Sequence, residues 1–309
     1  MNQDITTIIE SDHDVRQSEV DRRHADNVFD AHLRRQMAQD MAPELIVPET
    51  LGIAGPFSSE IEGIADVVAQ GHDALKNSSE TNGLKNRLIP NKAYADPGIV
   101  ESPLFQLALN PILLASVSRY LGFVPILATA DYWYNPNSKT TDGKQQGYPT
   151  SLYHLDWADN RILKVFVHCS DITQKNGPLN LIDATASQQI LTSIDYRFPR
   201  RRNTSDDPKT TNGIYVSDSF VQSNAAPEIE THSLVGESGT VFLADTSRCF
   251  HYGGRNIETG NPRLLGVLQY LRPGALKLAR KHDDIAPFHH LARASMSPLE
   301  RLVLGTSAE

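Results

Sequence analysis

The spacing of hydrophobic residues changes character near residue 124. Before it, apolar positions recur at intervals of three and four, which predicts amphipathic helices. We expect these helices at 18–42, 58–75 and 102–121. The last is expected as two short helices separated at Pro111 and ended by Gly122, because proline interrupts a helix and glycine favours its end.

The helix expected at 58–75 carries a start signal, since Ser59 and Glu62 have the spacing of a capping box. His72 falls on its apolar stripe together with Ile64 and Val68. We therefore expect His72 to pack against the core rather than to bind a metal.

After residue 124, short runs of β-branched, aromatic and aliphatic residues separated by turn signals predict strands. These runs lie at 127–134, 162–168, 179–182, 231–235, 240–243 and 264–271. The tail after Pro273 is expected to be mostly helical, with Ser297 as an N-cap and Pro298 in the first turn.

Helices followed by strands and then by helices predict a mainly β protein with flanking helices, as a sandwich or barrel rather than an alternating α/β sheet. We divide the chain into a helical part (1–123), a β core (124–275) and a helical tail (276–309). A long polar insertion is expected at 195–230. Its run Arg200–Arg202 indicates either a solvated surface loop or a lid that binds an anionic group.

Composition excludes several classes of function. The 309 residues carry a formal net charge of −8, which argues against broad nucleic-acid binding. No stretch approaches the roughly 18 apolar residues of a membrane span, and the polar N-terminus does not resemble a signal peptide. We expect a cytoplasmic protein whose two cysteines, Cys169 and Cys249, are free thiols.

His154 and Asp156 carry the most informative chemistry. They precede the strand at 162–168. Because residues i and i+2 of a strand share a face, an imidazole and a carboxylate with this spacing can bind one cation from the same side. The His-x-Asp pattern alone is weak, because it occurs three times. The pair His24/Asp26 lies in a helical pattern and His282/Asp284 in a charged stretch without strand signals.

His251 supplies a second imidazole later in the chain. Two histidines and one carboxylate with open metal positions describe a ferrous oxygenase site. A 2-oxo acid can occupy two of the open positions and dioxygen the third. Because the imidazoles must be unprotonated to bind, metal affinity should fall at acid pH.

Arg263 begins the strand expected after His251. An arginine at this position can point inward, where its planar guanidinium binds a carboxylate through two parallel hydrogen bonds. We expect Arg263 to bind the cosubstrate.

Together, these motifs resemble the phytanoyl-CoA dioxygenase-like family of iron(II)- and 2-oxoglutarate-dependent oxygenases over roughly residues 100–275. The similar segments are 103–105, 120–122, 153–157, 163–167, 171–179 and 239–245, with His251, Asn256 and Arg263. The resemblance implies a double-stranded β-helix, a jelly-roll, cupin-like barrel with helices on one side.

The resemblance also implies the reaction. Oxidative decarboxylation of 2-oxoglutarate, with dioxygen, to succinate and carbon dioxide would be coupled to hydroxylation of a C–H bond. His154, Asp156 and His251 would hold Fe(II), and Arg263 would hold the distal carboxylate of 2-oxoglutarate. Tyr132 or Tyr134 would assist in binding this cosubstrate.

Several features refine what the resemblance implies. Asp156 stands where halogenating members have a small residue, which favours hydroxylation. Trp157 is expected either to line the pocket or simply to pack in the core. The segment Ile182–Ser187 departs from the usual proline-glycine-serine-histidine pattern, so relatives do not identify the small-molecule substrate. The arginines near residue 201 suggest an anionic one.

Three alternatives remain. A zinc or manganese hydrolase would need a nearby general base, and the sequence places no glutamate close to His154 or His251; Glu258 is expected in a turn beyond the ligand. The other two are a non-catalytic binding protein and a cupin-type enzyme that needs no 2-oxo acid. Loss of Arg263 distinguishes these two from a 2-oxoglutarate-dependent oxygenase, because only the activity of that oxygenase requires this side chain.

Overall fold

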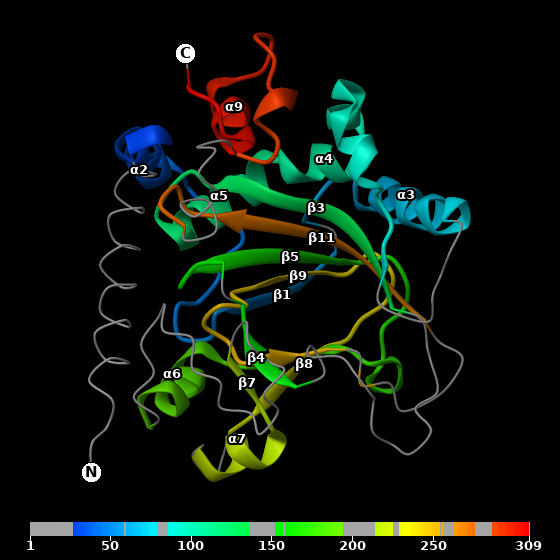
Figure 1. Ribbon diagram of the computed structural model, residues 1–309, viewed down its shortest axis with the longest axis vertical. Helices are drawn as coiled ribbons and strands as arrows, with labels where there is room; N and C mark the ends of the chain where they lie inside the picture. The colour runs from blue at the N-terminus through cyan, green and yellow to red at the C-terminus, as the bar shows by residue number, and fades with distance from the viewer. Residues whose placement is uncertain are drawn as a thin grey trace, which may run out of the picture.

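The computed structural model describes residues 27–58, 60–78, 86–135, 152–156, 158–193, 214–224, 229–253, 255, 262–275 and 286–308. Two antiparallel sheets lie face to face in this part of the chain (Figure 1). The larger sheet has the order β1 (Ile53–Phe57), β9 (Val241–Ala244), β5 (Ile162–His168), β11 (Arg263–Leu271), β3 (Ile126–Asn135) and β2 (Asn86–Arg87). The smaller has the order β7 (Ile214–Val216), β4 (Tyr153–Leu155), β10 (His251–Tyr252), β6 (Leu179–Ile182) and β8 (Thr231–Leu234).

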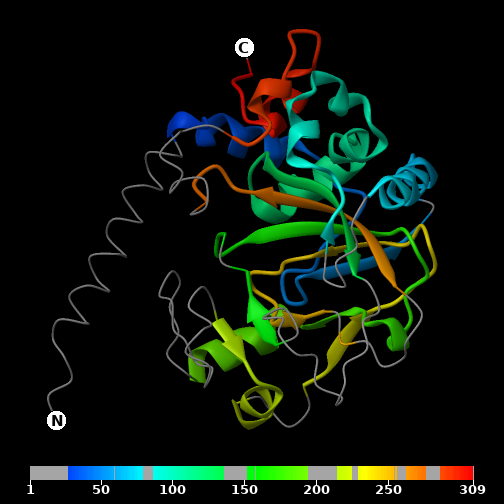
Figure 2. The ribbon, with the colours of Figure 1, turned by 45° about the vertical axis from the view of Figure 1, so that its right-hand side comes forward.

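Helices cover the outer sides of both sheets, as Figures 1 and 2 show. On the larger sheet lie α2 (Ala31–Asp40), α3 (Ile64–Asn77), α4 (Pro103–Ala108), α5 (Pro111–Leu121) and α9 (Pro298–Leu304). On the side of the smaller sheet lie α6 (Ala184–Ser193) and α7 (Asp218–Asn224). Single 3-10 turns occur at η1 (Asn91–Ala95), η2 (Pro97–Glu101), η4 (Gln174–Asn176) and η5 (His289–Leu291).

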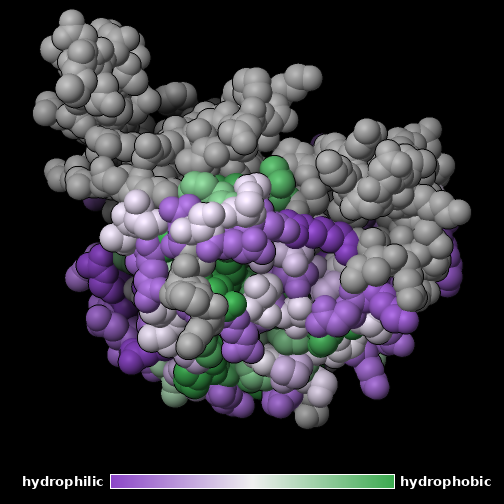
Figure 3. Space-filling model, turned by 90° about the horizontal axis from the view of Figure 1, so that it is seen from below, coloured by the Kyte–Doolittle hydropathy of each residue, from purple (hydrophilic) through white to green (hydrophobic). Residues whose placement is uncertain are grey.

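The outer surface is mainly polar on the side of the smaller sheet, where hydrophilic residues surround limited apolar areas (Figure 3). Among the described residues, the large hydrophobic side chains that are exposed are Val28, Ile46 and Leu51. In the same part of the chain, no helix combines the length and the apolar character that crossing a bilayer requires.

Several predicted elements are confirmed. The helices α4 and α5 are separate; Pro111 is in the first turn of α5, and Gly122 ends it with a positive φ of 77°. The strands β5 and β6 have the predicted bounds. At α9, Ser297 is the expected N-cap with Pro298 in the first turn, and it also forms a capping box with Glu300.

Other expectations were wrong. The helix α3 begins at Ile64, after Gly63 with its φ of 81°, rather than at the Ser59–Glu62 signal. His72 is exposed on it instead of packed. The strand β1 lies in the segment expected to be helical and pairs with β9. The helix α6 interrupts the segment expected to be β.

Within the described residues no strand pairing joins the two sheets, so a closed barrel is not present there. The sheets instead share a hydrophobic layer. Phe166, Phe242 and Leu265 of the larger sheet pack with Leu181 and Leu234 of the smaller one.

Alternation along β5 shows which side chains enter the space between the sheets. Val165 and Val167 belong to the core under the helices, whereas Phe166 packs between the sheets. Lys164 and His168 share the face of Phe166, because residues two apart on a strand point to the same side. Two polar side chains of β5 are therefore directed to the interior between the sheets.

Arg34 joins the helical layer to the rest of the chain and is fully buried. Its guanidinium donates to the carbonyl oxygens of Phe29, Val124 (3.2 Å), Pro125 (3.1 Å) and Leu302 (2.7 Å). Burial lowers its pKa to about 9, and the charge of nearby Asp30 opposes this shift. One side chain thus satisfies carbonyl groups from the adjacent turn and from two distant segments of the chain.

Replacing this residue should destabilise the fold. We expect Arg34→Met to lower the free energy of unfolding by about 3 kcal/mol, because buried carbonyl groups lose their donors. Urea unfolding followed by circular dichroism measures this change. The adjacent Arg35 is exposed, and Arg35→Met should change stability by less than about 0.5 kcal/mol. Equal effects of the two substitutions would show that the carbonyl contacts of Arg34 contribute little.

Candidate metal centre

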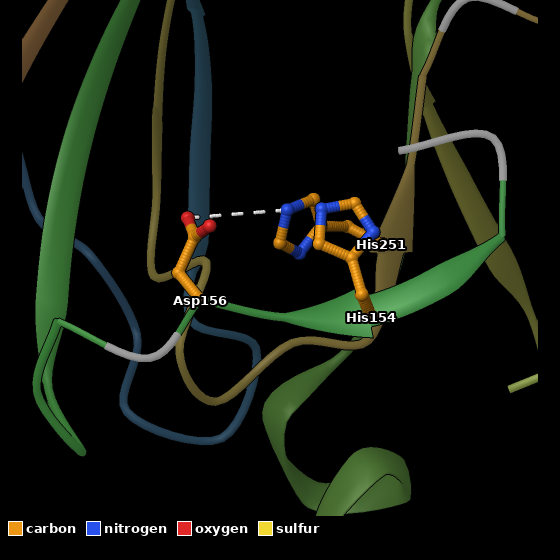
Figure 4. A group of neighbouring side chains, drawn as sticks. All are labelled: His154, Asp156 and His251. Carbon is orange, nitrogen blue, oxygen red and sulfur yellow. Dashed lines mark ion pairs between the residues drawn. The ribbon is translucent and has the colours of Figure 1, made fainter. Parts of the chain in front are cut away.

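Strand pairing brings the two predicted histidines together. The strand β10 lies between β4 and β6, and in the register of β10 with β4, His251 is directly opposite His154. Directly opposite residues of an antiparallel pair project to the same face. The two imidazole rings accordingly lie side by side, with centroids 4.2 Å apart (Figure 4).

Asp156 completes the cluster from the residue that follows β4. Its carboxylate points towards the imidazoles, and its Oδ2 is 4.0 Å from Nε2 of His251 (Figure 4). One potential ligand atom from each of the three residues lies within 4.8 Å of the others. No other cluster of at least three such side chains occurs in the part of the chain that the structure describes.

The turn between β9 and β10 holds these ligands in place. Buried Asp245 accepts hydrogen bonds from Tyr120 Oη (2.9 Å), Ser247 Oγ (2.7 Å) and the amide of Arg248 (3.1 Å). Burial raises the pKa of Asp245, while these donors oppose the shift. In the same turn the carbonyl of Thr246 accepts from the amide of Asp156 at 2.9 Å. The turn that leads to His251 thus also anchors Asp156.

Each histidine is oriented by a backbone carbonyl group just before its own strand. Nδ1 of His154 is 2.9 Å from the carbonyl oxygen of Leu152, and Nδ1 of His251 is 3.0 Å from that of Cys249. A carbonyl oxygen only accepts, so we assign the proton of each neutral ring to Nδ1. In this tautomer Nε2 is the ring nitrogen that carries the lone pair, the arrangement typical of metal-binding histidines.

The charges of the cluster suit a divalent cation. Burial lowers the pKa of His251 to about 3, the neighbouring His154 adds to this shift, and Asp156 opposes it. Burial works to raise the pKa of Asp156, but the Lys164 ammonium and the two histidines outweigh it and hold that pKa well below its usual range. At neutral pH, His251 is a neutral donor and Asp156 an ionised one. The donor set therefore fits ferrous iron or a similar ion.

Lys164 is a residue of this site that the sequence analysis did not single out. Its side chain is 9% exposed, and Nζ lies 2.5 Å from Oδ2 of Asp156. The ammonium is also 5.4 Å from the ring centroid of Trp133 on β3. The sequence carries a signal, since Lys164 is the one charged residue in the apolar run 162–167.

Arg263 is buried at the start of β11 and reaches the smaller sheet. Its guanidinium donates to the carbonyl of Gly177, and Nη2 would be 3.3 Å from a Cβ built on Gly253, two residues after His251. Burial lowers its pKa to about 10. Within the described residues, no carboxylate pairs with it. The guanidinium of Arg263 thus lies close to the backbone that follows the histidine strand β10.

The tyrosines expected to assist cosubstrate binding lie elsewhere. The Tyr132 hydroxyl is 2.9 Å from the carbonyl oxygen of Val67 and 2.9 Å from Oε1 of Gln70, both on α3. Tyr134 packs in the same cluster between the larger sheet and the helices. The expectation for both tyrosines was therefore wrong, because it did not assign their face of β3. Trp133, between them, packs on the face towards the smaller sheet.

Several residues that belong to the motifs and predictions from the sequence lie outside the described part of the chain. They are Trp157, Asn256, Glu258, Arg200–Arg202 and the other two His-x-Asp pairs, His24/Asp26 and His282/Asp284.

Comparison with known proteins gives similarities of fold at low identity. The sequence matches no family model and no curated protein. The chain is similar to the alpha ketoglutarate dependent carbocyclase SnoK (13% identity, 75% of this chain and 85% of that one, TM-score 0.48). It is also similar to the epimerase SnoN in complex with Fe3+, alpha ketoglutarate and nogalamycin RO (15%, 72% and 79%, 0.47). A third is HygX from Streptomyces hygroscopicus with nickel and 2-oxoglutarate bound (17%, 72% and 83%, 0.44).

His168 is a further titratable group in the interior, which the sequence analysis did not single out. It is 1% exposed, lies opposite Leu265 in the register of β5 with β11, and has its ring centroid 5.3 Å from that of Phe242. Burial lowers its pKa from 6.5 to about 4, and the charge of Arg263 acts in the same direction.

This shift predicts how stability depends on pH. Between pH 6.5 and about 4 the unfolded chain binds a proton at His168 that the folded chain does not, so its contribution is complete above pH 6.5 and lost as the pH falls. Relative to His168→Gln, we expect metal-free wild type to lose about 2 kcal/mol of unfolding free energy between pH 7.5 and pH 5. Urea unfolding at each pH measures it.

The exposed His72 provides the control, because His72→Gln should keep the pH dependence of wild type. Parallel curves for wild type and His168→Gln would show that His168 is not kept neutral by the fold.

Proposed function

We propose that this protein is an Fe(II)- and 2-oxoglutarate-dependent oxygenase that hydroxylates a C–H bond of a small molecule. The observation that carries this proposal is the convergence of His154, Asp156 and His251, which brings one potential ligand atom of each residue within 4.8 Å of the others. Two neutral imidazoles and one carboxylate leave about three positions open on an octahedral ion. That number suits a bidentate 2-oxo acid and dioxygen.

The three side chains would hold the metal through Nε2 of each histidine and a carboxylate oxygen of Asp156. Ferrous iron held there would supply the chemistry by which dioxygen gives one oxygen atom to succinate, as 2-oxoglutarate loses carbon dioxide, and the other to the C–H bond of the substrate. The presence of a carboxylate at position 156 supports hydroxylation, since the ligand position that another anion would need is filled.

Arg263 would bind the distal carboxylate of 2-oxoglutarate. Its guanidinium is buried without a counter-ion among the described residues, and an unpaired buried charge is costly. A carboxylate would supply that counter-ion through two parallel hydrogen bonds. Gly253 leaves room beside the guanidinium, because a Cβ there would come within 3.3 Å of Nη2.

The fold supports this assignment in a coarser way. Two antiparallel sheets packed face to face are the architecture of jelly-roll proteins, and we propose that the chain is a double-stranded β-helix of this kind. Between the sheets, the side chains of Trp133, Phe166 and Leu265 form part of an apolar lining. Such a lining suits a substrate with an apolar part.

Loss of any one ligand should abolish turnover. We expect His154→Ala, Asp156→Ala and His251→Ala each to lower 2-oxoglutarate consumption at least about a hundredfold. Each should also weaken metal binding, since one of the three metal ligands is removed. Succinate release with ferrous iron and ascorbate, measured against a library of small molecules, gives the activity. Tight binding of Ni(II) gives the independent readout. If wild type binds one divalent ion but never consumes 2-oxoglutarate, a binding protein or a 2-oxo-acid-independent enzyme replaces this proposal.

Arg263→Lys tests the cosubstrate site. Lysine keeps the charge but loses the bidentate contact, so the KM for 2-oxoglutarate should rise about ten- to a hundredfold while Ni(II) affinity without cosubstrate stays within about twofold. The exposed Arg35→Lys is the matched control. An unchanged KM would remove Arg263 from the cosubstrate site.

A further inference from the structure

Lys164 occupies an unusual place for an amino group. It lies in the middle of β5, a central strand of the larger sheet, opposite Gln269 of β11 on one side and Ala244 of β9 on the other. Lysine is rarely buried unless it is paired. Its one carboxylate partner among the described residues is Asp156, the same side chain that completes the candidate metal cluster.

In the absence of a metal, the charges of Lys164 and Asp156 balance each other. One ammonium and one carboxylate are neutral together, and their contact of 2.5 Å compensates both for the loss of water. The face of Trp133, 5.4 Å from Nζ, adds a weaker cation–π contact. Asp156 is thus held near both histidines by a resident positive charge.

A divalent cation changes this balance. Once the Asp156 charge is shared with the cation, the Lys164 ammonium loses most of its compensation. The interior then contains an ion of charge +2, Lys164 and Arg263 against the single negative charge of Asp156, a net charge of about +3. In a buried site such an excess is strongly unfavourable unless an anion enters.

We propose that Lys164 couples metal binding to anion binding: its ammonium opposes the metal when no anion is present, and it becomes a counter-ion of the 2-oxo dicarboxylate once the metal is bound. This inference rests on the proposed function, because it assigns Lys164 a role in the same site. The class of ligand follows from the charges. A dianion lowers the net charge to about +1, whereas a monoanion leaves about +2.

One substitution should therefore shift two affinities in opposite directions. In Lys164→Met, Ni(II) without cosubstrate should bind about tenfold more tightly, because a competing positive charge is absent. Binding of 2-oxoglutarate to the Ni(II)-loaded protein should weaken about tenfold. Since coupling between two ligands is reciprocal, the factor by which 2-oxoglutarate strengthens Ni(II) binding should fall as much as the factor by which Ni(II) strengthens 2-oxoglutarate binding.

The measurement is isothermal titration of Ni(II) with and without 2-oxoglutarate, at one pH and one salt concentration. Lys164→Gln is the second variant in case Lys164→Met does not fold, and it should give the same pair of shifts. Lys164→Arg retains the charge and should keep the Ni(II) affinity within about threefold of wild type. Lys76→Met, at a lysine whose side chain is 75% exposed, is the control and should change neither affinity.

The outcomes separate the two proposals. If wild type binds neither Ni(II) nor 2-oxoglutarate, the proposed function fails. If wild type binds both, but the neutral variants weaken both affinities, Lys164 merely supports the structure of the site and the coupling inference is overturned. It is overturned as well if both affinities of the neutral variants stay within about twofold of wild type.

Discussion

The candidate metal centre depends above all on one antiparallel pairing, that of β10 with β4. Because it places His251 directly opposite His154, two imidazoles from distant parts of the chain share one face of the smaller sheet. The turn before β10 also holds the third ligand in place, since the carbonyl of Thr246 in that turn accepts a hydrogen bond from the amide of Asp156. Buried Asp245 shapes this turn through donors from Tyr120 and Arg248. A shift of β10 by one residue would turn His251 to the opposite face.

Two buried arginines show how differently a charge can be accommodated. Arg34 donates to four backbone carbonyl groups of the surrounding core, which makes it a structural residue. Arg263 has one carbonyl partner, Gly177, in the described part of the chain and faces the interior between the sheets. Burial lowers the pKa of both, but only the second guanidinium is left with capacity for an incoming anion. Lys164 belongs to the same interior, and its partner Asp156 is one that a metal would also bind.

Much of this site could be predicted from the sequence, because the signals for it lie in short stretches of neighbouring residues. The His154-Leu155-Asp156 spacing requires only that residues two apart share a face, and the strands near 162–168 and 264–271 have clear apolar runs. The tyrosines of β3 could not be placed in this way. Every position from Ile126 to Tyr132 is buried, so alternation does not reveal which face is which. Lys164 was missed for a related reason, since its partner comes from another sheet. The start of α3 depended on the backbone freedom of Gly63, which outweighed the side-chain signal at Ser59.

The hydrogen bonds that orient the two imidazoles have a consequence for ion selectivity. Each ring is oriented by the carbonyl group two residues earlier in the chain, just before its own strand, so the position of the ring follows that of the strand. The distance between the two imidazole rings is then set by the distance between neighbouring strands, which backbone hydrogen bonding keeps near 4.8 Å in any sheet. Divalent ions of similar radius would fit equally well, and discrimination among them would fall to their relative abundance and their affinity for nitrogen.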